Sequence, residues 1–245
     1  MNETKISLRR STTWSASTTM ATATRLGFWR VAVILLLLAG QSGCQGIVLL
    51  GYLLGGPPTT DPDFHQKTKE TLEGKNKVTL VYCFASKELK WDHESVDFDL
   101  AKHVAYQLNG KKIKVVDPDR VYAWLDKHDR WRKTSEIGAA FKADYIVHID
   151  VKDYSLTEAN VNNLYRGRAD CIVNVVKMDE NKRDGTVIYT TPIKSNFPKN
   201  GPVDQSAMPY TEFKKRYLSA LSYEIGKLFF STETGDDIPY SMLQQ

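Results

Sequence analysis

The sequence predicts an α/β fold built on one mixed sheet, parallel at its start and antiparallel at its end. Two short β-rich runs each precede a helical pattern, which is typical of parallel strand pairing. Three later segments alternate apolar and polar residues, which indicates an antiparallel meander with one wet face. An amphipathic helix follows, so the predicted order is βαβααβββα within residues 75–231, with a tail at 232–245.

The first strand is predicted at 77–84, because KVTLVYCF is rich in β-forming residues and is mostly apolar. The polar stretch SKELKWDHES that follows is expected to be a loop. Asp97 is then expected to cap a helix whose apolar residues recur at helical spacing until Asn109-Gly110 ends it. A second strand is predicted at 112–116, where the sequence reads KIKVV.

Three more helices are predicted from capping residues and spacing. Asp117-Pro118 combines an N-cap aspartate with proline at the first helical position, which is a typical helix start. A further short helix is expected to begin near Thr134. The last helix is predicted at 210–230, with its aromatic and aliphatic residues on one side.

The meander between these helices is predicted from strict alternation. Asp184-Gly185 is expected to close the hairpin between its second and third strands. The residues expected to face the core are Tyr145, Val147, Ile149 and Val151 on the first strand, Ala169, Cys171, Val173 and Val175 on the second, and Val187, Tyr189 and Ile193 on the third.

The basic character of the chain lies almost entirely in its leader. The chain has 33 basic and 29 acidic residues, but five basic residues and one acidic residue precede Cys44. The remainder therefore carries 28 of each and is formally neutral. A nucleic-acid partner has no electrostatic support from such a domain.

Residues 1–44 are expected to be a signal peptide that hands Cys44 to a lipid, with Met20 as an alternative start. Ser42-Gly43-Cys44 resembles a bacterial lipobox, although Gln41 stands where an aliphatic residue is usual. The alternative anchor is a transmembrane helix, since no charged residue occurs between Val31 and Pro58.

Either anchor leaves the domain on the exported side. Basic residues before the apolar run hold the N-terminus in the cytoplasm, by the positive-inside rule. The Gly/Pro-rich stretch within 45–74 is expected to act as a tether between the anchor and the domain.

The runs EIGAAFKADYIVHIDVKDYSL, LYRGRADCIVNVVKMD and GTVIY resemble an uncharacterised family of planctomycete-type envelope lipoproteins. More distantly, the element order is similar to the N-terminal domain of the Tol-Pal translocation protein. It also resembles the curli-secretion lipoprotein and the lipoprotein activators of penicillin-binding proteins. The resemblance implies a membrane-tethered, non-enzymatic interaction domain that binds an unknown envelope protein. It supplies no catalytic residue, metal site or cofactor.

One candidate partner-binding patch is predicted on the outward side of the meander, at His148, Asp150, Arg166 and Arg168. If the strands turn near residue 159, Asp150 is expected opposite Arg168 and His148 opposite Asp170. Such cross-strand charge pairs are also the ordinary dressing of a solvent-facing sheet, and both interpretations remain open at this point.

A second, weaker candidate is the loop at Asp92, His93 and Glu94, which holds three ligand-type side chains. It suggests the alternative function of a periplasmic small-molecule-binding or hydrolytic domain, anchored by an N-terminal transmembrane helix. Adjacent side chains cannot all point at one ion, so no metal site is predicted. No G-x-S-x-G, H-E-x-x-H or nucleotide-binding string occurs.

Cys83 and Cys171 both lie within β-like apolar runs. They are expected to be buried reduced thiols, and a disulfide across adjacent strands is left open.

Overall fold

The computed structural model describes residues 59–161 and 163–233. The predicted leader 1–44 with Cys44, the alternative anchor helix and nearly all of the tail lie outside these residues. Within them, no helix is both long and apolar enough to cross a membrane. The fold is α/β with a mixed sheet, as the sequence predicts.

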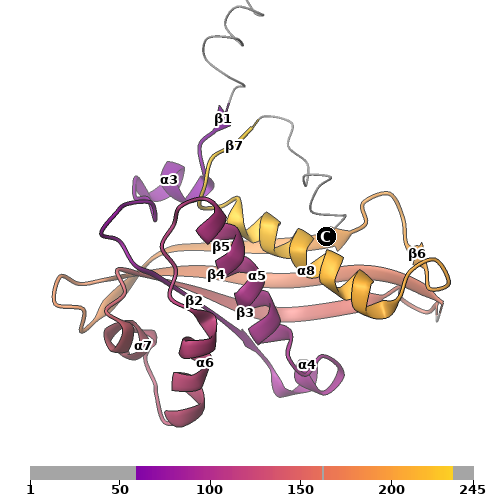
Figure 1. Ribbon diagram of the computed structural model, residues 1–245, viewed down its shortest axis with the longest axis horizontal. Coiled ribbons are helices and arrows are strands. Elements are labelled where there is room, and N and C mark those ends of the chain that lie inside the picture. The colour runs from indigo at the N-terminus through magenta and orange to yellow at the C-terminus, as the bar shows by residue number, and fades with distance from the viewer. Residues whose placement is uncertain (1–58, 162, 234–245) are drawn as a thin grey trace, which may run out of the picture. The chain divides into compact units, whose positions relative to one another are not determined.

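The sheet has the strand order β2-β3-β4-β5 (Figure 1). The strand β2 (Thr79–Ala85) runs parallel to β3 (Tyr145–Thr157). The strands β4 (Leu164–Met178) and β5 (Gly185–Phe197) then continue antiparallel. The short strand β6 (Val203–Asp204) pairs with the start of β4. The predicted change from parallel to antiparallel pairing is therefore confirmed.

Helices cover the sheet unequally on its two faces. The helices α5 (Val96–Gly110) and α8 (Tyr210–Gly226) lie side by side across one face (Figure 1). The helices α6 (Pro118–Lys127) and α7 (Thr134–Phe141) cover only one end of the opposite face. The short helix α4 (Lys87–Asp92) occupies the segment that was predicted as a loop.

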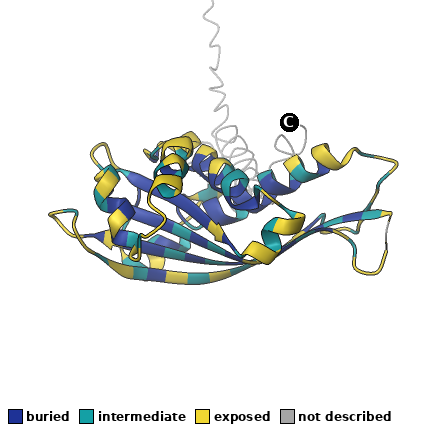
Figure 2. Cartoon of the chain, turned by 90° about the horizontal axis from the view of Figure 1, so that it is seen from below, coloured by how far each residue is buried: buried dark blue, intermediate teal, exposed yellow. Residues whose placement is uncertain are grey.

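Two separate apolar clusters follow from this arrangement. The larger one lies between the sheet and α5 and α8, where buried residues gather in Figure 2. The smaller one lies under α6 and α7, around Leu80, Ile146 and Val176. These three residues alternate with the residues of the larger cluster, because successive side chains of a strand point to opposite faces.

The packed domain begins earlier than the predicted boundary at residue 75. The helix α3 (Asp63–Thr68) places Phe64 in the core with no exposed surface, and Leu72 is also fully buried. The Phe64 ring contacts those of Tyr189 and Phe229. The last third of the predicted tether is thus part of the domain, and the strands β1 (Thr59–Thr60) and β7 (Thr232–Glu233) pair beside it. No sequence pattern indicates this helix, because a single aromatic residue in a polar segment carries no periodicity.

The second predicted strand, at 112–116, forms only one parallel bridge, between Val115 and Thr79. Lys112 adopts a positive φ of 63° to close the turn after α5, and Asp117 already caps α6. Too few residues remain between the two helices for a longer ladder. The Asp117-Pro118 start itself is confirmed, since the Asp117 side chain accepts a hydrogen bond from the Asp119 N–H.

The N-cap of α5 lies two residues before the predicted cap Asp97. Ser95 precedes its first residue, and Asp97 lies in the first turn, where it is buried and paired with Lys90. An acidic residue in the first turn is as favourable as a cap, which is why the two positions are hard to tell apart in a sequence.

The predicted register between the first two meander strands is wrong by four residues. Asp150 lies opposite Ile172, and Arg168 lies opposite Ser155. The strand β3 runs on to Thr157, and the Glu158 N–H donates to the Leu164 carbonyl, so the turn is centred near residue 161. Extending both strands shifts every pair along the ladder.

The inward side of the meander is otherwise confirmed, except near the hairpin. Ten of the predicted residues are buried or partly buried, whereas Val187 is 57% exposed. A bulge lies between Val175 and Val176, which pair with Tyr189 and Val187 respectively. The extra residue turns Val187 to the outer face.

Candidate functional site

The structure divides the predicted partner-binding patch into two separate places. Arg168 pairs with Ser155, five residues along β3 from Asp150, which at about 3.3 Å per residue is roughly 16 Å away. Arg166 and Arg168 instead bind the same carboxylate, Glu158, at 3.1 and 2.8 Å. Both arginines therefore stabilise the β3–β4 turn through Glu158 and do not contact Asp150 or His148.

Glu158 is held as an anion by this arrangement. The Ala159 N–H, followed by Arg168 and Arg166, keeps the pKa of the Glu158 carboxyl below its ordinary value. Arg166 also donates to the Asn196 side chain at 2.8 Å. Both guanidinium groups are thus engaged within the domain, which makes a structural role the simpler account of them.

His148 and Asp150 lie together on the open face of the sheet, which is the face that α5 and α8 do not cover. The His148 ring stacks on Tyr82 with the ring centroids 4.6 Å apart. Burial lowers the pKa of His148 below 6.5, and the nearby Asp150 carboxylate opposes this shift. Asp150 forms its own ion pair with Lys152 at 2.5 Å.

The loop candidate does not converge on a ligand position. Asp92 and Glu94 are exposed, whereas His93 is partly buried with its ring edge-on to Tyr154 at 4.8 Å. Burial lowers the pKa of His93. Within residues 59–161 and 163–233, no group of three His, Cys, Asp or Glu side chains is placed to hold a metal ion.

Both cysteines of the sheet are free thiols and are buried. Burial raises the pKa of Cys83 well above its ordinary value and that of Cys171 to about 12. A thiol in this state is a poor nucleophile, because the thiolate is the reactive form.

The open face and its outer edge expose some apolar side chains. Phe84 is 54% exposed, and the ladder continues from it through Asp150 and Ile172 to Pro192. Among the strands described, none pairs with the outer edge of β5, where Val187 is exposed. Along this edge, Pro192 opposes pairing with a further strand, because proline lacks the N–H that an added strand would use.

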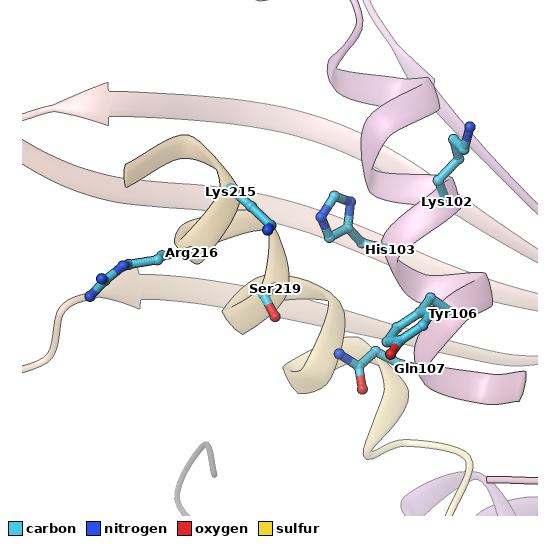
Figure 3. A pocket seen from close by; sticks show the side chains of 7 residues that line it. All are labelled: Lys102, His103, Tyr106, Gln107, Lys215, Arg216 and Ser219. Carbon is cyan, nitrogen blue, oxygen red and sulfur yellow. The ribbon is translucent and has the colours of Figure 1, made fainter. Parts of the chain in front are cut away.

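A groove of about 360 Å³ lies between α5 and α8 on the other side of the molecule (Figure 3). Basic and polar side chains line it, and none of them is acidic: Lys102, His103, Tyr106, Gln107, Lys215, Arg216 and Ser219.

The cations of this groove differ in their surroundings. Lys102 pairs with Asp119 at 3.1 Å, and Arg216 pairs with Glu212 at 2.5 Å. In Figure 3 both point away from the groove, whereas Lys215 and His103 point toward one another across it. Lys215 has no ion-pair partner in the described part of the chain.

Sequence reasoning missed this groove because its two walls are more than one hundred residues apart. The available signals were weak. Tyr106 falls on the outward side of a helix and is 71% exposed, and the basic run Lys214-Lys215-Arg216 interrupts an otherwise apolar helix. Neither feature shows that the two helices lie side by side.

No protein-family profile matches the sequence, and no curated protein matches it either. Among solved structures, a single-residue variant of the PelC dodecamer from Paraburkholderia phytofirmans is 11% identical, covering 71% of this chain and 98% of that chain with a TM-score of 0.42. Lipoprotein GNA1162 from Neisseria meningitidis is 12% identical, covering 61% and 97%, with a TM-score of 0.38. The hypothetical protein CT253 from Chlamydia trachomatis is 16% identical, covering 62% and 91%, with a TM-score of 0.38. At these identities and scores the likenesses carry no argument about function, and the family resemblance stays a prediction.

Proposed function

We propose that this protein is an exported lipoprotein, tethered through Cys44, whose domain binds another cell-envelope protein and carries no enzymatic activity. The tether rests on the leader sequence, in which a basic region, an apolar run and Ser42-Gly43-Cys44 follow in the order of a lipoprotein signal. The binding role rests on the open edge of β5.

The edge of β5 is the single observation that carries the binding role. An unpaired edge presents backbone N–H and C=O groups that an extended segment of a partner can bind as an added strand. The stretch from Thr186 to Thr191 is suited to this, since Val187 and Thr190 are exposed and Pro192 ends the usable ladder. The exposed Val187 side chain offers apolar contact beyond the backbone bonds.

The binding role is tested by photo-cross-linking in living cells. A photoreactive residue in place of Thr190 is expected to give one discrete adduct with an envelope protein. Val187→Lys should abolish this adduct, because a charge on an edge strand opposes strand addition. Val161→Lys changes another exposed valine, in the β3–β4 turn, and should leave the adduct unchanged. The same adduct with both variants, or no adduct, would contradict the proposal.

The tether is tested separately by metabolic labelling with a palmitate analogue. The wild-type protein is expected to incorporate the label and Cys44→Ala to lose it. Equal labelling of both would remove the lipoprotein assignment and leave the N-terminal helix as the anchor.

A further inference from the structure

We propose that the groove between α5 and α8 is a docking site for an acidic peptide segment of a partner protein. This surface is distinct from the β5 edge, so the inference does not depend on the proposed function. It rests on three properties of the groove: the character of its polar groups, the available charge of Lys215 and the exposed ring of Tyr106.

The polar groups that face the groove can donate hydrogen bonds to an anion. The Lys215 ammonium can only donate, and the Ser219 and Tyr106 hydroxyls can donate as well. The His103 Nδ1 donates to the Asp99 carbonyl oxygen at 2.8 Å, so this N–H is used within α5 and is not available to a ligand. Since no carboxylate among the described residues lines the groove, an anionic group is the complement that this lining lacks.

The charge of Lys215 is not neutralised within the described residues. The adjacent Lys214 binds Asp99 at 2.7 Å and lies outside the groove lining. Lys102 and Arg216 at the rim each form an ion pair with one carboxylate, Asp119 and Glu212 respectively. An incoming carboxylate would therefore gain its strongest contact from Lys215 and weaker attraction from the rim.

Tyr106 favours a peptide over a free inorganic anion. Its ring is 71% exposed beside the cationic centre, and a bare phosphate would leave that apolar surface in water. An acidic residue with an apolar neighbour would use both features. Exposed tyrosine and arginine are also enriched where proteins contact one another.

The groove is preformed by the fold. The helix α5 is fixed to the sheet by Leu100, Val104 and Leu108, and α8 is fixed by Tyr217 and Leu221, all of which are buried. A rigid pair of helix faces reduces the ordering cost of binding, so a short peptide is sufficient as a probe.

The test uses the full-length chain in detergent micelles and a fluorescein-labelled octapeptide of alternating glutamate and tyrosine. Fluorescence anisotropy is expected to show saturable binding that weakens as salt rises, because the attraction is electrostatic. Lys215→Glu should weaken the binding at least tenfold and Tyr106→Ala severalfold. Lys75→Glu makes the same charge change at an exposed lysine outside the groove and should leave the binding unchanged.

Several results would overturn the proposal. Absence of saturable binding, or equal loss in Lys215→Glu and Lys75→Glu, would show that the groove is not the site. Displacement of the peptide by an equal concentration of inorganic phosphate would assign the groove to a free anion. Binding that appears only after Asp236 and Asp237 are replaced by Asn would assign it to the chain's own acidic segment.

Discussion

On the face covered by α5 and α8, the inward side chains of all four long strands are buried or partly buried, apart from a few at the strand ends. On the opposite face, α6 and α7 cover only the residues around Leu80 and Tyr82. The outward side chains further along the strands are partly or fully exposed to solvent. Both faces belong to the same strands, because successive side chains of a strand point to opposite sides of the sheet. The two faces therefore differ in what they contribute to stability: apolar burial on one side stabilises the fold, and substitutions on the other side should cost little folding free energy.

Substitutions of two phenylalanines, one on each face, test this contrast with the largest expected effect. Phe64→Ala is expected to lower the free energy of unfolding by about 3–5 kcal/mol, because the ring is fully buried against Tyr189 and Phe229. Phe84→Ala, on the open face, should change it by less than about 0.5 kcal/mol. Urea denaturation measures both changes in the free energy of unfolding. A small change for Phe64→Ala would show that the helix α3 is part of the tether and not of the packed domain.

A glycine under α8 gives the next largest effect. A Cβ at Gly167 would overlap the ring of Tyr217, which lies flat on the strand. Gly167→Ala should therefore destabilise the domain by about 1–3 kcal/mol through overpacking. Gly110→Ala is the matched control, since a Cβ there meets nothing within 4 Å. Equal thermal midpoints for the two variants would mean that α8 does not rest on β4 at this point.

His148 tests how far the open face is shielded from water. Its pKa, measured by NMR, is expected below 6.5 because of burial, and Asp150→Asn should lower it further by removing the anion that raises it. A lowered pKa means that the folded state resists protonation. The contribution of His148 to stability is then present above pH 6.5 and is lost as the pH falls through the folded-state value. In His148→Gln, which has no titrating ring, the free energy of unfolding should depend less on pH. A pKa of His148 at or above 6.5 would contradict the burial of its ring.

The smallest effect is expected at a charge pair on the open face. Lys194 lies 3.5 Å from Asp170, and the Lys194 side chain is 81% exposed. Lys194→Ala should change the free energy of unfolding by about 0–1 kcal/mol, as is usual for exposed pairs. A larger loss in urea denaturation would show that the open face contributes to stability more than its exposure indicates.

Patterns that span a few residues were predicted well. The Asp117-Pro118 start and the alternation of β3 and β4 depend on local chemistry, and the structure has both. The hairpin between β4 and β5 is also present, but its turn lies at 180–183, and Gly185 is already the first residue of β5. The register between β3 and β4 was not predictable in the same way. It depends on where the turn closes, and a shift of four residues leaves the inward and outward sides unchanged.

The expected pairing of the candidate site residues was wrong for a related reason. Arg166, Arg168, Asp150 and His148 do share the outward face, as alternation requires, but alternation says nothing about distance along the strand. The groove between α5 and α8 carried even less signal, because Tyr106 and Lys215 meet only through helix packing.

By itself, the sequence determined the α/β class, the change from parallel to antiparallel pairing and the residues that point toward the core. These follow from helical and strand periodicity, which are properties of neighbouring residues. Only the tertiary structure decided that Phe64 belongs to the core, that Glu158 binds both arginines and that α5 and α8 form a groove. Each of these depends on contacts between segments far apart in the chain, and backbone periodicity holds no information about such contacts.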